Sequence, residues 1–294
     1  MKSLRKEDIK QEVFDLYDAY AHNKLERRDF VQKLSMYAVG GITVPSLMSF
    51  LMPDYESTFI VDKNNPDLDS SFITYNSTKG GGEIKALLSK PKSAIDKLPG
   101  IVVVHENRGL NPYVEDTARR AALEDFITIA PDALSPLGGY PGNDDKGREM
   151  QRTRDRNEML EDFIAAFEYL KSHKDCNGKI GVVGFCFGGW ISNMMAVKVP
   201  DLGASVPFYG GQPTEGIEHI NAPLMLQYAG LDERVNAGWP AYEKALKALG
   251  KENVAYFYPN VNHGFHNTST PRYDEPAAEL AWSRTIEFFK EKLI

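Results

Sequence analysis

Residues 180–190 read Ile-Gly-Val-Val-Gly-Phe-Cys-Phe-Gly-Gly-Trp, an apolar run followed by Gly-x-Cys-x-Gly-Gly. The run at 180–184 has the length and character of a strand buried on both faces of a sheet, and a helix is expected after the glycines. A turn this tight strains the backbone of Cys186, so small residues are needed two positions before and after it. It presents the thiol at a helix N-terminus, where the helix dipole favours a thiolate. The motif therefore predicts a nucleophilic Cys186.

Strands and helices alternate on both sides of this motif. Residues 58–61, 71–75 and 83–88 are predicted strands, and the glycines at 80–82 make the last two a hairpin. Apolar runs predict further strands at 100–104, 126–130, 180–184, 204–208, 224–228 and 254–258. Helical stretches separate them, clearest at 113–123, 156–172, 239–249 and 277–292. This order predicts an α/β fold, in which helices cover both faces of a mostly parallel central sheet.

An acid and a base follow Cys186 in the chain, each in a loop after a predicted strand. Asp232 follows the strand at 224–228, and His263 follows the strand at 254–258. Parallel sheets carry their chemistry beyond the carboxyl ends of the strands, so we expect these side chains to meet Cys186. Asp232 would orient His263, which would keep the thiol deprotonated. Glu233 is a rival acid and His266 a rival base.

The first 56 residues have a different texture and are predicted to form an N-terminal helical extension before an α/β domain at 57–294. Residues 9–25 are amphipathic and acidic, which favours a helix packed on the main domain or on a partner subunit. The second arrangement would make the protein a homo-oligomer.

Residues 26–52 also resemble a twin-arginine export signal. Arg27-Arg28-Asp29-Phe30-Val31 precedes an uncharged stretch at 34–52. Glu26 stands where such signals carry Ser or Thr, and no Ala-x-Ala cleavage site follows. Pro45 interrupts the stretch, so no stable membrane span is expected. We therefore expect a cytoplasmic protein, with export to the periplasm as the alternative.

The composition of the 294-residue chain excludes several classes of protein. Acidic residues number 41 and basic residues 34, for a net charge of −7, which argues against nucleic acid as a partner. Two cysteines cannot staple a chain of this length, and Cys176 lies at the opposite end of the predicted strand from Cys186. The histidines and acids do not show metal-ligand spacing, so neither a metal nor another cofactor is predicted. The isolated histidines are interpreted as structural or solvated: His22, His105, His173 and His219.

Together these motifs resemble the dienelactone hydrolases, cysteine members of the α/β-hydrolase superfamily. The resemblance covers roughly residue 83 to the C-terminus. It rests on Gly-Phe-Cys-Phe-Gly-Gly at 184–189, Val-His-Glu-Asn-Arg-Gly-Leu-Asn at 104–111, Ala-Pro-Asp at 130–132, Gly-Leu-Asp at 230–232 and His-Gly-Phe at 263–265. It implies an α/β-hydrolase fold and an enzyme that cleaves small esters or lactones through an acyl-enzyme on Cys186, with no cofactor.

The resemblance also assigns supporting roles. In the family, the carboxylate at the Glu106 position contacts the resting thiol and helps to activate it. The backbone N–H groups of Asn107 and Phe187 match the oxyanion-hole positions, which suits residues that follow a strand end and begin a helix. A thioesterase or peptidase on the same scaffold, or an inactive binding protein of this fold, are the alternative functions.

One departure concerns substrate binding. Family members that hydrolyse dienelactone hold its carboxylate with arginines, one of them four residues after the catalytic histidine, where this chain has Asn267. Tyr140, in a Gly/Pro-rich loop at 134–143, is a candidate for the pocket wall, as are His266 and Arg272. Another group of arginines cannot be aligned with the family from sequence: Arg148, Arg152, Arg154 and Arg156.

Overall fold

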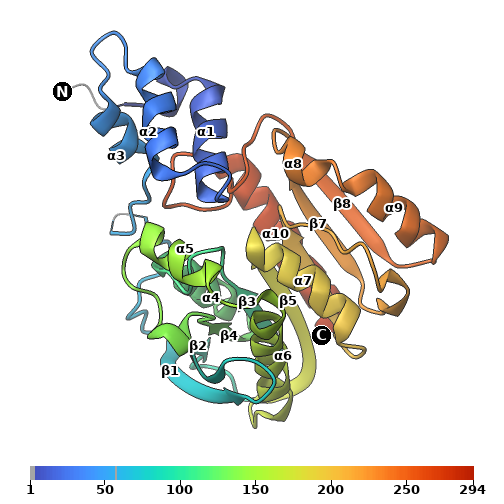
Figure 1. The fold of residues 1–294 in the computed structure, drawn as a ribbon. Coiled ribbons are helices and arrows are strands. Elements are labelled where there is room, and N and C mark those ends of the chain that lie inside the picture. Colours follow the sequence, from blue (N-terminus) through green and yellow to red (C-terminus); the bar gives the residue numbers. More distant parts are fainter. Residues whose placement is uncertain (1–3, 57) are drawn as a thin grey trace.

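The computed structural model describes residues 4–56 and 58–294, which contain one eight-stranded sheet with the order β1-β2-β4-β3-β5-β6-β7-β8 (Figure 1). Strands β3 to β8 pair in parallel, while β1 and β2 form an antiparallel hairpin that joins the sheet through β4. The strands are β1 (Leu68–Ser77), β2 (Gly82–Pro91), β3 (Leu98–Val104), β4 (Ile127–Pro131), β5 (Cys176–Phe185), β6 (Ala204–Phe208), β7 (Leu224–Ala229) and β8 (Asn253–Tyr258). The predicted α/β class, with its mostly parallel sheet, is confirmed.

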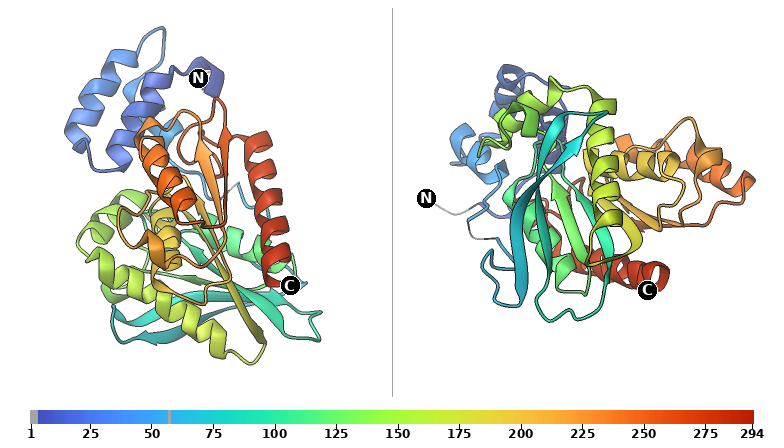
Figure 2. Two further views of the ribbon diagram at one scale, coloured as in Figure 1. Left: turned by 90° about the vertical axis from the view of Figure 1, so that its right-hand side faces the viewer. Right: turned by 90° about the horizontal axis from the view of Figure 1, so that it is seen from below.

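Helices cover both faces of this sheet, as the two views in Figure 2 show. On one face, α4 (Pro112–Ala122) and α10 (Glu275–Leu293) pack over a core that includes Phe126 and Phe208. On the other face lie α6 (Arg156–Ser172), α7 (Phe187–Lys198) and α9 (Trp239–Ala248). Two shorter helices follow strands at the carboxyl edge, α5 (Asp144–Arg152) and α8 (Glu233–Asn236). The continuous apolar strands predicted from sequence therefore lie between two helical layers.

The strand predicted at residues 58–61 is wrong. Residues 58–61 form no strand, and the backbone N–H groups of Ile60 and Val61 donate instead to Oδ1 of Asp116, at 3.2 and 2.7 Å. A buried carboxylate thus satisfies the donors that a neighbouring strand would otherwise pair. The predicted hairpin is confirmed and is longer than expected at both ends.

Residues 4–52, called here the N-terminal module, fold into three α-helices around a core of their own. These are α1 (Gln11–Ala21), α2 (Arg27–Leu34) and α3 (Val44–Leu51). Aromatic and aliphatic side chains fill the core, among them Phe14, Tyr17, Phe30, Leu34, Leu47 and Leu51. The twin-arginine-like segment is part of this module: Arg27 begins α2 and pairs with Asp145 at 2.5 Å.

The module lies beside α5 and α8, at the end of the sheet where the parallel strands finish (Figure 1). Within the part of the chain that the structure describes, no helix is both long enough and apolar enough to cross a membrane.

Candidate active site

Cys186 lies at the sharp turn between β5 and α7. Its backbone adopts φ 58° and ψ −110°, a left-handed conformation that L-residues rarely take. Neighbouring glycines allow the turn, because a Cβ on Gly184 would collide with the carbonyl of Gly188, and one on Gly188 with that of Val104. The sequence motif thus forms the strained turn it predicted, with the side chain of Cys186 at the carboxyl edge of the sheet.

His263 and Asp232 meet beside this turn. Nδ1 of His263 lies 2.5 Å from Oδ2 of Asp232, and both side chains are buried. The other carboxylate oxygen accepts a hydrogen bond from the backbone N–H of Val235 at 3.1 Å, which caps α8. Nε2 of His263 is buried and has no hydrogen-bond partner within the described residues. The rival acid, Glu233, is exposed.

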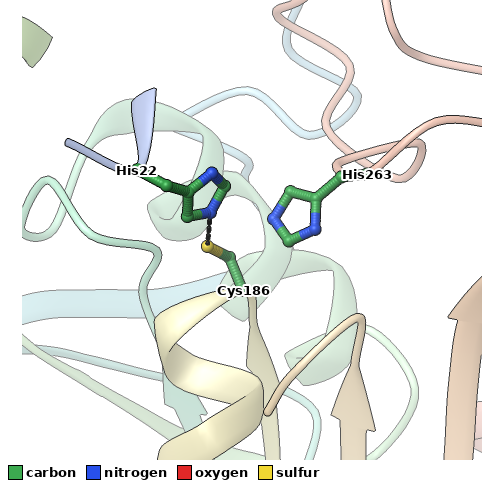
Figure 3. A group of neighbouring side chains, drawn as sticks. All are labelled: His22, Cys186 and His263. Carbon is green, nitrogen blue, oxygen red and sulfur yellow. Dashed lines mark hydrogen bonds between the residues drawn. The ribbon is translucent and has the colours of Figure 1, made fainter. Parts of the chain in front are cut away.

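A second histidine, which comes from the N-terminal module, reaches the thiol. Nε2 of His22 lies 3.2 Å from Sγ of Cys186, and His22 and His263 approach the sulfur from different elements (Figure 3). Their rings meet edge to face, with centroids 4.7 Å apart. The interpretation of His22 from sequence, as a structural or solvated residue, did not include this contact with Cys186. The available signal was the Asp18-x-x-x-His22 spacing at the end of an amphipathic helix, which places both side chains on one helix face.

The ionisable groups around Cys186 favour a thiolate paired with an imidazolium. Burial alone would raise the pKa of Cys186, but His22 and His263 outweigh it and hold that pKa well below its ordinary value. Burial opposes the charged form of His263, yet Asp232, Cys186 and Asp18 raise its pKa to about 10. For His22, burial is likewise outweighed by Cys186 and Asp18, so its pKa is raised.

Glu106 is buried beside the site and accepts a hydrogen bond from Nδ2 of Asn267 at 2.8 Å. Burial is the main cause that raises the pKa of Glu106, and Arg108 opposes the shift. Asn267 therefore contacts the carboxylate predicted to tune the thiol. Asn107 and Phe187, the predicted oxyanion-hole residues, both line the cavity that contains Cys186.

That cavity has a volume of about 490 Å³ and a cationic wall. The guanidinium of Arg156 stacks on Trp190, 3.6 Å from the ring centroid. Arg154 pairs with Asp162 at 2.6 Å, and Arg148 pairs with Asp145 at 3.4 Å. Five arginines line the cavity in all, within the described residues: Arg148, Arg152, Arg154, Arg156 and Arg234.

The three candidate substrate-binding residues lie outside this lining. Tyr140 donates to Asp144 at 2.7 Å, in the loop before α5. His266 is completely buried against aromatic rings, and the Tyr113 hydroxyl lies 2.7 Å from its Nδ1. Arg272 is buried under the N-terminal module, over the ring of Tyr17. The geometry therefore gives none of the three a position in the Cys186 cavity.

The side chains of Cys186, His22 and His263 also bring together donor atoms that could hold a metal ion, a grouping that sequence spacing did not predict. Their ligand atoms all lie within 4.8 Å of one another. Thiolate and imidazole are the donors that Zn²⁺ prefers, and both Nδ1 atoms face carboxylates, as metal-binding histidines commonly do.

Comparison with known proteins places this site in a family. Residues 84–293 match the model of the dienelactone hydrolase family, and residues 1–40 match a separate model described as YqhI-like. The hydrolase fragment YghX of Escherichia coli is 50% identical over 114 residues, which cover 39% of this chain and 97% of YghX. A Saccharolobus solfataricus protein named as a carboxymethylenebutenolidase is 30% identical over 249 residues, covering 71% of this chain and 95% of that protein.

The fold agrees with this match. A Klebsiella pneumoniae crystal structure named as a dienelactone hydrolase superposes with a TM-score of 0.66 at 24% identity, covering 76% of this chain and 98% of that one. The match to the family model extends over most of the chain, so the protein belongs to the dienelactone hydrolase family, whose members are α/β-fold hydrolases of ester or lactone bonds.

Proposed function

We propose that this protein hydrolyses small carboxylic esters or lactones with Cys186 as its nucleophile, His263 as its general acid–base and Asp232 as the residue that orients His263. The observation that carries the proposal is a thiol on a strained strand-to-helix turn, within 4.8 Å of a histidine whose other ring nitrogen is bound to a carboxylate. Nucleophilic catalysis needs this arrangement of attacking group, base and orienting acid.

The reaction proceeds in two halves. Sγ of Cys186 attacks the carbonyl carbon, and the backbone N–H groups of Asn107 and Phe187 stabilise the oxyanion. Collapse of this intermediate breaks the bond to the leaving oxygen, which takes up a proton from an imidazolium beside Cys186, and leaves a thioester on Cys186. Water then attacks the thioester while Nε2 of His263 accepts its proton. The acid leaves and the thiolate is restored.

Glu106 supports the nucleophile in this proposal. A negative charge on its buried carboxylate would raise the free energy of the nearby thiolate, so the state of Glu106 tunes the reactivity of Cys186. The hydrogen bond from Asn267 stabilises the ionised carboxylate. Asn267 stands where an arginine is expected for dienelactone, so it serves Glu106 rather than a substrate carboxylate.

The substrate we propose carries an anionic group. Three arginines of the cavity wall pair with carboxylates, namely Arg148, Arg154 and Arg234. Arg156 instead stacks on Trp190 and lines the cavity. A guanidinium held flat on an aromatic ring is well placed to bind a carboxylate or phosphate. The arginine proposed to bind the anionic group of the substrate therefore lies on α6 rather than after the catalytic histidine.

The deciding experiment traps the covalent intermediate. Purified protein is mixed with a panel of lactones, aryl esters, acyl thioesters and peptides, quenched in acid and examined by mass spectrometry, with Cys186→Ala as the control. An acyl adduct on Cys186 with turnover of esters or lactones supports the proposal. Faster turnover of thioesters or peptides would assign the alternative activities. Neither adduct nor turnover would indicate an inactive binding protein of this fold.

We also propose that the protein acts in the cytoplasm with its N-terminal module retained. Arg27 and Phe30, the residues that resemble an export signal, belong to the folded module through the ion pair with Asp145 and burial in the helical core. Cleavage of a signal would remove His22 from the site. Intact-mass measurement of the protein isolated from its native cell tests this, and a chain that begins near Asp54 in the periplasm would contradict it.

A further inference from the structure

We propose that His22, oriented by Asp18, is a second catalytic histidine, and that it protonates the leaving group when Cys186 is acylated. This inference rests on the proposed function and adds a residue from outside the part of the chain that matches the hydrolase family. The N-terminal module would then be part of the active site.

The arrangement around His22 repeats the one around His263. Nδ1 of His22 lies 2.8 Å from the backbone oxygen of Asp18 and 3.1 Å from its Oδ1, while Nε2 lies 3.2 Å from Cys186 Sγ. An imidazole whose Nδ1–H is held in this way presents its Nε2 in one orientation. His22 also ends α1, where the helix dipole favours a positive charge. The module thus brings an Asp–His pair to the reacting sulfur.

Two side chains of the α/β domain bind the backbone at the end of α1. Nδ2 of Asn107 donates to the carbonyl oxygen of Ala21 at 2.7 Å, and the guanidinium of Arg148 donates to that of Tyr20. Both carbonyls belong to the last turn of α1, immediately before His22. Asn107 also lines the cavity, so one residue bounds the reaction space and fixes the helix that carries the second histidine.

Arg234 connects the two Asp–His pairs. Its Nε lies 3.5 Å from Oδ2 of Asp18, and its Nη2 lies 3.9 Å from Oδ1 of Asp232. The same Nη2 is 3.3 Å from Nε2 of His22 and 3.2 Å from Nδ1 of His263. The positive charge of one guanidinium therefore lies near the carboxylates of both Asp18 and Asp232 and favours their ionised form.

Two histidines allow the two proton transfers of the reaction to be divided. In the resting enzyme the proton of Cys186 resides on His22. The thiolate attacks the ester, the carbon–oxygen bond breaks, and Nε2–H of His22 is transferred to the leaving oxygen, so that His22 becomes neutral. Acylation removes the negative charge of the sulfur, one of the charges that raise the pKa of His263, so His263 releases its proton to solvent. Neutral His263 then accepts the proton of the attacking water as the thioester is hydrolysed and the thiolate departs. Uptake of a proton from solvent by His22 restores the resting state, so one ester and one water yield one alcohol and one acid.

The leaving group provides the test. Single-turnover acylation is measured with 4-nitrophenyl, 4-chlorophenyl and phenyl acetate for wild type, His22→Gln and Asp18→Asn. A 4-nitrophenolate leaves without a proton, whereas phenolate needs one. We expect His22→Gln to slow acylation by phenyl acetate about 100-fold, and by 4-nitrophenyl acetate less than about tenfold. Asp18→Asn should also slow acylation by phenyl acetate more than acylation by 4-nitrophenyl acetate, by smaller factors than His22→Gln. His219→Gln and Asp15→Asn are matched controls on exposed side chains.

A second measurement does not depend on substrate. Alkylation of Cys186 by iodoacetamide at pH 6 should be slower by about tenfold in His22→Gln, because the thiolate loses an adjacent positive charge. Melting temperatures of all variants show whether the module remains folded.

The outcomes distinguish a failure of this inference from a failure of the proposed function. If His22→Gln slows acylation by all three esters equally, His22 has a structural role. If the rates are unchanged, His22 takes no part in acylation, and if they rise, it hinders acylation. Each of these three results overturns the inference. If Cys186→Ala still turns over esters, the proposed function itself fails. If Cys186→Ala and His263→Ala are inactive while His22→Gln behaves like wild type, only the inference fails.

Discussion

Asp232 uses both oxygens of its carboxylate: Oδ2 holds Nδ1 of His263 at 2.5 Å, and Oδ1 caps α8 through the backbone N–H of Val235. The residue that orients the histidine is therefore itself fixed by a helix end. Glu233, the next residue, is exposed and belongs to the helix.

We expect Asp232→Asn to lower kcat by about 10⁴-fold, because the amide no longer selects the productive tautomer of the imidazole. Glu233→Gln should change it less than about twofold. Steady-state kinetics on both variants checks this, and comparable losses would contradict it.

The two histidines of the loop after β8 should separate into a catalytic and a structural residue. His263→Ala should abolish turnover with little change in melting temperature. His266 is completely buried among Phe185, Phe208 and Trp282, so His266→Ala should lower the free energy of unfolding by about 2–4 kcal/mol. Urea denaturation and kcat measured on the same samples distinguish them. A stable, inactive His266→Ala would show that the base is misassigned.

The two cysteines should differ sharply in their reaction with iodoacetamide. A lowered pKa keeps a thiol ionised at lower pH, so Cys186 should react at a nearly constant rate from pH 8 down to about 6. Burial raises the pKa of Cys176, so its rate should become appreciable only above about pH 9. Peptide mapping after timed alkylation gives both rates. Equal labelling at pH 6 would contradict the assignment of the nucleophile.

Arg156 should matter for charged substrates and not for neutral ones. Arg156→Gln is expected to raise KM for a phenyl half-ester of succinate about tenfold, and to leave KM for phenyl acetate nearly unchanged. Arg284→Gln is the matched control, since Arg284 also stacks on an aromatic ring, that of Tyr256, but lies outside the cavity. An equal rise for both esters in Arg156→Gln would show that its contact with Trp190 shapes the cavity rather than binding an anion.

Zinc should inhibit the enzyme through the sulfur and the two imidazoles. Binding of Zn²⁺ to the Cys186 thiolate would block its attack, and removal of the metal with EDTA should restore activity. His22→Gln removes one of three donors, so the inhibition constant should rise about tenfold or more. Inhibition assays at fixed pH measure this. An unchanged constant in His22→Gln would place the metal elsewhere.

The sequence predicted the features that depend on local pattern. Apolar runs such as 100–104 become buried parallel strands because two helical layers enclose them, and the glycines around Cys186 leave little choice of turn. Asp232 and His263 could be placed because the carboxyl ends of β7 and β8 meet at one edge of the sheet. These inferences need only the topology of the core.

The contribution of His22 could not be predicted in the same way. Its distance from Cys186, 164 residues away, depends on how a separately folded module docks, and that is determined by side chains such as Asn107 and Arg148 from unrelated parts of the chain. The same applies to Arg272, which the module covers. The strand predicted at 58–61 does not form because the buried carboxylate of Asp116 binds the backbone there. The local sequence gives no reason to expect that contact.

The connection between α3 and β1 has a consequence for how the protein must be handled. Because it ties the N-terminal module to the core, docking of α1 is governed by an effective concentration rather than by dilution. Residues 62–64 of this connection are exposed, so a protease could cut it while both folded parts remain. Specific activity of the nicked enzyme would then fall on dilution and recover on concentration, whereas the intact chain would show no such dependence.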